Sequence, residues 1–208
     1  MAVRKGKARL AYALSRPPGH HAERGLFGGY CYFNNSALAA RVLKKSGRVA
    51  IVDIDFHHGN GTQDLFLKDD QVLTISLHGD PREFFPFYVG FPTETGHPKA
   101  PGLNMNLVLE SGTDGQAYLQ ALEAHVLPAL EFFAPDYLVV AMGLDGYVKD
   151  PIGAFTLTTE DFQRIGERLG ALGLPTVAVQ EGGYYTPHLG RNAVAVLEGL
   201  RTGALSHV

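Results

Sequence analysis

Short apolar runs alternate along the chain with longer amphipathic stretches. The short runs are rich in β-branched residues, which is typical of strands buried on both faces, and the longer stretches repeat their apolar residues at helical spacing. The predicted strands are 49–55, 72–77, 104–108, 137–142 and 175–180, and the predicted helices are 34–46, 114–133, 158–172 and 188–200. This alternation indicates the α/β class, with a mostly parallel sheet that carries helices on both faces.

One long stretch has almost no regular pattern. Residues 79–103 are rich in Gly and Pro and are predicted to form a loop. A loop of this length inside a compact domain usually has a function. We therefore expect it to contribute to a binding site.

The length suits one α/β domain or two small ones, and without an internal repeat or a linker we expect one domain over residues 1–208. Hydrophobic residues are 45% and charged residues 19%, a balance typical of globular chains. The net charge of −3 offers no basic surface for nucleic acid or an anionic membrane. The single cysteine, Cys31, excludes an internal disulfide and a CxxC zinc site. The apolar run 137–144 is too short to cross a bilayer and the run 10–14 too short for a signal peptide, so we expect a cytoplasmic protein.

Polar side chains gather where the predicted strands end, and ligands of parallel α/β sheets bind at that edge. Asp53, Asp55 and His57 alternate along one strand, so they are predicted to share a face. With Asp145, which follows the strand 137–142, Asp55 and His57 make a three-ligand set for one divalent metal ion, with zinc favoured and one position open for water. The alternative is that these carboxylates cap helices or pair with histidine.

Two further segments carry candidate catalytic groups. The rigid turn Arg16–Gly19 is followed by the adjacent histidines His20 and His21, which alternatively are solvated loop residues. After the last strand, two glycines precede Tyr184, whose hydroxyl is suited to stabilise an oxyanion. The alternative is a strand-to-helix turn with an incidental tyrosine.

The order of these segments resembles the zinc-dependent histone deacetylase superfamily. The motifs are RPPGHHA, GGYCYFNN, VDIDFHHGNGTQ, GLDGYVKDPIG and QEGGY, and residues 76–96 and 160–184 are most similar to its bacterial acetylpolyamine amidohydrolase branch. The resemblance implies the arginase/deacetylase fold, a three-layer α/β/α sandwich. Chains of the family carry a long stretch before RPPGHH, whereas 15 residues precede Arg16 here, so a shortened N-terminus is implied.

The resemblance also implies a role for each site residue. Asp55, His57 and Asp145 match the zinc ligands. His21 matches the general base and acid, and His20 its electrostatic partner. Asp53 matches the carboxylate that orients His20, Asn60 stands in place of an Asp that would polarise His21 more strongly, and Tyr184 matches the catalytic tyrosine. Gly29, Tyr30 and Phe85 match residues of the substrate tunnel, and Ile152 stands where some polyamine deacetylases place a Glu. A potassium site is implied at Asp53, Ser76 and the carbonyls of Asp55, His57 and Leu77.

The expected function is a zinc-dependent amidohydrolase, with a structural potassium ion, that deacetylates acetylpolyamines or similar small acetylated amines. A homodimer fits the resemblance, and an acidic gate for the distal ammonium is expected from the absent front segment or from Glu94, if the long loop folds inward. The alternatives are a deacetylase of acetyl-lysine in proteins and a truncated, non-catalytic metal-binding remnant. A manganese arginase-type hydrolase is disfavoured because such sites need more Asp ligands than this sequence assembles.

Overall fold

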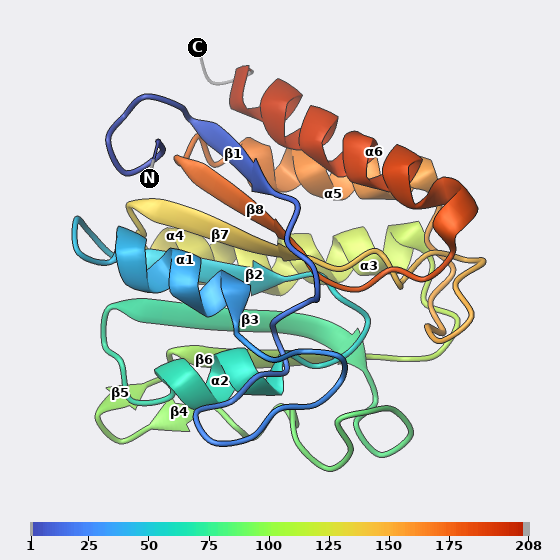
Figure 1. The fold of residues 1–208 in the computed structure, drawn as a ribbon, viewed down its shortest axis with the longest axis horizontal. Helices are drawn as coiled ribbons and strands as arrows, with labels where there is room; N and C mark the ends of the chain where they lie inside the picture. Colours follow the sequence, from blue (N-terminus) through green and yellow to red (C-terminus); the bar gives the residue numbers. More distant parts are fainter. Residues whose placement is uncertain (1, 206–208) are drawn as a thin grey trace.

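The fold is built on one parallel sheet. A computed structural model describes residues 2–205, and its six-stranded sheet has the order β1-β8-β7-β2-β3-β6, with every neighbouring pair parallel (Figure 1). The strands are β1 Leu10–Ala13, β2 Val49–Asp53, β3 Val72–Gly79, β6 Asn104–Leu109, β7 Tyr137–Met142 and β8 Thr176–Gln180. A separate antiparallel pair joins β4 Gly96–His97 to β5 Ala100–Pro101. The predicted parallel sheet is confirmed.

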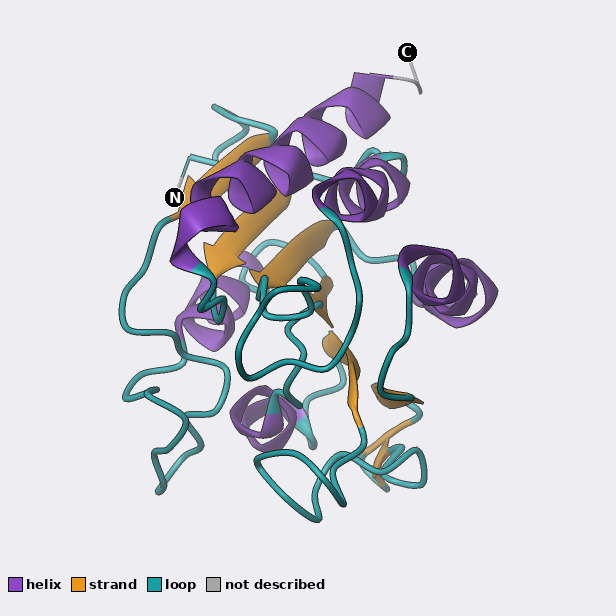
Figure 2. Cartoon of the chain, turned by 90° about the vertical axis from the view of Figure 1, so that its right-hand side faces the viewer, coloured by secondary structure: helices purple, strands orange, loops and turns teal. Residues whose placement is uncertain are grey.

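Helices cover both faces of the sheet and make it the middle layer (Figure 2). The helices α1 Asn35–Leu43 and α2 Asn60–Phe66 pack on one face. The other face carries α3 Gly115–Ala121, the π-helix η1 Leu122–Val126, α4 Leu127–Phe133, α5 Thr159–Gly170 and α6 Thr186–Leu205. None of the helices among residues 2–205 combines the length and the apolar character that crossing a membrane would need.

Two apolar cores follow from the alternation of side chains along the buried strands. Val49 and Ile51 of β2 pack into the core under α1, whereas Ala50 and Val52 pack into the larger core under α3 to α6. All of β2 is buried because helices cover it on both sides. This explains why its sequence is a continuous apolar run rather than an alternating one.

The structure corrects several predicted elements. β1 and α2 were not predicted, and the long loop 79–103 contains the β4–β5 hairpin. The predicted helix 114–133 is interrupted by η1, where the Leu127 N–H bonds to the Leu122 carbonyl. Pro128 follows at the start of α4 and has no N–H to donate, so the regular α-helical ladder cannot continue through it.

The strand order brings the candidate chemistry together. β8, β7 and β2 are neighbours, and their carboxyl ends lie at one edge of the sheet. Asp53 ends β2, Asp145 follows β7 and Tyr184 follows β8. These three segments, distant in sequence, therefore meet at a single site.

Candidate active site

A buried cluster of two carboxylates and an imidazole lies at this edge. Ligand atoms of Asp55, His57 and Asp145 all lie within 4.8 Å of one another, and all three residues are buried. His57 Nδ1 is 2.8 Å from Asp145 Oδ2 and 3.3 Å from Asp55 Oδ1. The structure thus brings the three predicted ligands together.

Turns, not strand alternation, produce this convergence. β2 ends at Asp53, so the prediction that Asp53, Asp55 and His57 share a strand face is wrong. Instead, Asp53 Oδ1 accepts the Asp55 N–H at 3.1 Å and Asp55 Oδ1 accepts the His57 N–H at 2.9 Å. Asp side chains that bond to backbone two residues on form turns of this kind. Asp145 Oδ1 accepts the Phe56 N–H at 2.8 Å and fixes the third ligand to the same segment.

The electrostatics of the cluster fit a divalent cation. Burial and the nearby Asp55 raise the pKa of Asp145 to about 7. Although burial opposes its charge, hydrogen bonds to Asp145 and Asp55 raise the pKa of His57 to about 10. Among residues 2–205, no Lys or Arg pairs with either carboxylate. Two adjacent buried carboxylates need a positive partner, and a mixed N/O set of three ligands suits a divalent metal ion with one position left open.

Backbone from the segment after β8 closes the cluster. The Gly182 N–H donates to Asp55 Oδ2 at 2.9 Å. A Cβ at Gly182 would lie 2.6 Å from Asp55 Oδ2 and 2.7 Å from Asp145 Oδ2, closer than real Cβ atoms approach. Glycine is therefore needed here for close approach to the carboxylates.

The tandem histidines differ in their surroundings. His20 Nδ1 lies 2.9 Å from Asp53 Oδ2, and although burial disfavours the charged ring, Asp55 and Asp53 raise its pKa well above the usual range. His21 Nδ1 lies 2.8 Å from Asn60 Oδ1, and burial together with the charge of His20 holds its pKa well below the usual range. These shifts favour a charged His20 and a neutral His21 at neutral pH, and the catalytic roles of the two rings stay predictions.

Two carboxylates behind the histidines were missed by the sequence analysis. Glu181 is buried, and its Oε2 accepts the Gly19 N–H at 2.6 Å and the His20 N–H at 3.0 Å. Glu23 Oε1 accepts from Asn60 Nδ2 at 2.6 Å, so the Asn60 amide is oriented with its oxygen toward His21. Glu23 follows the motif RPPGHHA and Glu181 lies within QEGGY, but neither carries a chemical signal of its own in the sequence.

Replacing Asn60 by Asp is expected to move the acid limb of the kcat/KM profile to higher pH. A carboxylate that accepts from His21 Nδ1 favours the protonated ring and raises its pKa. His21 accepts a proton only when neutral, so activity is lost at pH values where the wild type is still active. Because Asn60 also faces Glu23, the profile is measured for Asn60→Asp alone and combined with Glu23→Gln. An acid limb that stays in place or moves to lower pH in both variants contradicts the assignment of His21 as base.

A tunnel-like cavity of about 310 Å³ leads to the cluster. Its lining residues are His21, Gly29, Tyr30, His57, Phe85, Ile152 and Tyr184. The three predicted tunnel residues therefore line the cavity, and so does Ile152. Phe85 packs edge-on against His21 with ring centroids 4.7 Å apart. Gly29 has φ +52°, and a Cβ there would lie 2.2 Å from the His21 ring, so this wall position also requires glycine.

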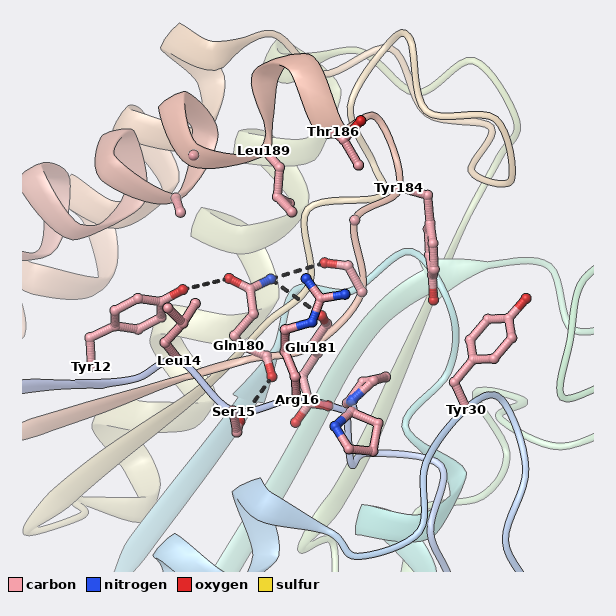
Figure 3. Close-up of a pocket in the computed structure, with 16 residues that line it drawn as sticks. Tyr12, Leu14, Ser15, Arg16, Tyr30, Gln180, Glu181, Tyr184, Thr186 and Leu189 are labelled. Atoms are coloured by element: carbon pink, nitrogen blue, oxygen red, sulfur yellow. Dashed lines mark hydrogen bonds between the residues drawn. The ribbon is translucent and has the colours of Figure 1, made fainter.

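A second cavity of about 690 Å³ lies beyond Tyr30 and Tyr184, which line both cavities. Figure 3 shows these two tyrosines at one end of it. Within it, Gln180 Oε1 accepts from the Tyr12 hydroxyl at 2.7 Å and Gln180 Nε2 donates to the Gly182 carbonyl at 3.1 Å. Gln180 thus anchors the start of the segment that carries Tyr184.

The proposed acidic gate at Glu94 is not at the tunnel. Its carboxylate accepts the Gly90 N–H at 2.9 Å, the Phe91 N–H at 2.8 Å and the Gln63 side-chain N–H at 2.6 Å. The long loop does fold inward, but toward α2 rather than toward the cavity, which Glu94 does not line. Glu94 instead fastens the loop that carries Phe85.

Of the predicted potassium ligands, Asp53 is the one that bonds to a tandem histidine, His20. Asp53 and Ser76 both line a small buried cavity between the sheet and α2, and Leu77 is buried in β3. Ser76 Oγ lies 2.8 Å from His78 Nδ1. A potassium ion at this place stays a prediction.

Comparison with known proteins finds similarity along nearly the whole chain. The sequence model of the histone deacetylase domain matches residues 1–200. Acetylpolyamine amidohydrolase 2 of Pseudomonas aeruginosa is 46% identical over 194 residues, which cover 92% of this chain and 56% of that protein. Histone deacetylase 8 of Arabidopsis thaliana is 38% identical, over 92% of this chain and 54% of that protein.

Comparison with solved structures finds the same kind of relative as comparison of the sequences. The crystal structure of acetylpolyamine aminohydrolase from Burkholderia pseudomallei matches with a TM-score of 0.92 at 46% identity, over 96% of this chain and 58% of that one. The chain therefore spans a little over half the length of these relatives.

Proposed function

The chain belongs to the histone deacetylase family, and from this we propose that it is a zinc-dependent amidohydrolase that removes acetyl groups from small N-acetylated amines. One observation carries the proposal: the Asp55/His57/Asp145 cluster, the His20–His21 pair and Tyr184 converge at a cavity that Tyr30 and Phe85 also line. A binding module would need the cavity but neither the histidine pair nor the tyrosine. This argues against a non-catalytic remnant.

The residues have complementary tasks. Bound zinc would polarise the amide carbonyl and acidify a water molecule. His21, whose low pKa favours the neutral ring, would accept a proton from the attacking water and return a proton to the leaving amine. Tyr184 donates its hydroxyl proton in a hydrogen bond to the oxyanion. Tyr30 and Phe85 enclose the aliphatic part of the substrate and exclude water.

Three finer points belong to the same proposal. A potassium ion between Asp53 and Ser76 would stabilise the backbone behind the histidines. A homodimer is supported by the exposed aromatic residues Phe27, Tyr32 and Phe33 beside the tunnel segment, since large exposed apolar patches mark interaction surfaces. A cytoplasmic location is consistent with the single, unpaired cysteine.

The test is hydrolysis by the purified, zinc-loaded chain of acetylputrescine, acetylspermidine and an acetyl-lysine peptide. We expect acetate release from the small amines at a higher kcat/KM than from the peptide. A preference for the peptide would assign the chain to protein deacetylation. No hydrolysis of any of the three would overturn the proposed activity.

Weak discrimination by the distal charge of the substrate is expected. Among residues 2–205, the tunnel lining contains no carboxylate, and Glu94 is engaged elsewhere. The kcat/KM ratio of acetylspermidine to a neutral acetamide of equal length should stay below about 10³, because that ratio needs over about 4 kcal/mol from a charge contact. Ile152→Glu should raise the ratio and the isosteric Ile152→Gln should not. A larger ratio in the wild type contradicts the expectation.

A further inference from the structure

Asp150 is a buried carboxylate that binds only backbone. It lies in the loop after β7, and its Oδ2 accepts the N–H of Tyr184 at 2.7 Å and of Tyr185 at 3.1 Å. Its Oδ1 accepts the Ile152 N–H at 3.1 Å. Among residues 2–205, no Lys or Arg forms an ion pair with it. Three N–H donors thus satisfy a carboxylate that neither the metal cluster nor the histidine pair uses.

These bonds connect two walls of the tunnel. Tyr184 and Ile152 both line the cavity, but they come from segments 32 residues apart in the chain. Asp150 binds the backbone of both, one on each carboxylate oxygen. A change at Asp150 therefore reaches the substrate cavity without Asp150 lining it.

Tyr184 needs an external restraint. It lies between β8 and α6 in a segment without regular secondary structure, directly after Gly182 and Gly183. Gly183 has φ +129°, and glycine restricts backbone conformation least of all residues. The direction of the Tyr184 side chain therefore depends on bonds to neighbouring segments, and its own N–H is bound by Asp150.

We propose that Asp150 is a positioning residue for the Tyr184 hydroxyl: it fixes the backbone of Tyr184 so that the hydroxyl meets the oxyanion, and it fixes Ile152 in the same cavity lining. The role rests on the proposed amidohydrolase function. It differs from general loop stability because its effect on the reaction passes through the Tyr184 hydroxyl.

A double-mutant cycle separates these two roles. Asp150→Ala is expected to lower kcat by about 10- to 100-fold in the wild-type background, because a displaced oxyanion donor loses most of its effect. In the Tyr184→Phe background the same substitution should cost less than about 3-fold, since the hydroxyl is already absent. Equal losses in both backgrounds, or an unchanged kcat in Asp150→Ala, would overturn the proposal.

Two matched variants control for folding. Asp114→Ala removes an N-cap carboxylate that accepts the Ala117 N–H at 2.9 Å on α3, outside the cavity lining, so it should lower the melting temperature but leave kcat unchanged. Asp150→Asn keeps one oxygen that can accept a backbone N–H, but its NH₂ group is a donor and cannot accept the other. A kcat between those of the wild type and Asp150→Ala is therefore expected. If Asp150→Ala does not fold, the cycle is run with Asp150→Asn. Metal content is measured in every variant and should not change.

Hydrogen exchange gives a readout that does not need activity. In Asp150→Ala the amides of Tyr184 and Tyr185 lose their acceptor and should exchange faster, whereas they should not in Asp114→Ala. Unchanged exchange at these two amides overturns the positioning role. The two proposals can fail separately. If the wild type hydrolyses no acetylated amine but the amides exchange faster in Asp150→Ala, the proposed function is overturned and the restraint of Tyr184 by Asp150 stands.

Discussion

Removing the divalent metal ion is expected to abolish hydrolysis, and adding zinc should restore it. Asp55, His57 and Asp145 are buried ligands, and among residues 2–205 no Lys or Arg pairs with either carboxylate, so the only positive partners of the metal site are the titratable rings of His20 and His57. Metal analysis of protein purified without added metal, followed by kcat measurement after chelation and reloading, tests this. Asp145→Asn keeps the shape of the ligand but lowers its charge, and it should lose metal and activity together.

The same ligands predict how metal affinity depends on pH. Without metal, His57 has a pKa of about 10 and Asp145 of about 7, so both carry protons at pH 6 and His57 still does at pH 8. A metal ion must displace these protons, and affinity should therefore rise as the pH rises from 6 to 8. A competition titration with a chelating dye at several pH values measures it. No bound divalent metal, and no activity restored by zinc, cobalt or iron, would refute the site.

The sequence was sufficient for five of the six strands of the parallel sheet and for the polar residues that follow them. Strands such as β2 are covered on both faces, so their apolar runs are continuous and readily recognised. Short or half-covered elements were not recognised. β1 has four half-buried residues, and α2 has seven and begins with Asn-Gly, a pair more typical of a turn.

The candidate metal ligands and histidines could be predicted because each belongs to a motif with its own chemistry. The residues that hold them could not. Glu23, Glu181 and Asp150 act by accepting backbone or amide N–H groups from segments that fold against them. In sequence they resemble ordinary loop carboxylates, which are mostly solvated. Only the packing of loops from several strand ends shows that they are buried or engaged.

Tyr184→Phe is expected to lower kcat by about 10²-fold or more while KM and metal content stay close to wild type. Burial, together with the carboxylates of Asp55 and Asp145, raises the pKa of Tyr184, so its hydroxyl keeps its proton at neutral pH and can donate it in a hydrogen bond. Removing one oxyanion donor typically costs that much because the charge it meets develops only in the transition state. The loss should therefore fall on kcat.

The neighbouring Tyr185 provides the matched control for this variant. Its ring packs against Tyr147 and His188, with centroids 5.8 Å and 5.4 Å away, and it does not line the tunnel. Tyr185→Phe makes the same chemical change one residue along the chain and should leave kcat nearly unchanged. Equal activity of Tyr184→Phe and wild type would remove Tyr184 from the reaction. Equal losses in the two variants would mean that packing of this segment, rather than a hydroxyl at the oxyanion, limits the rate.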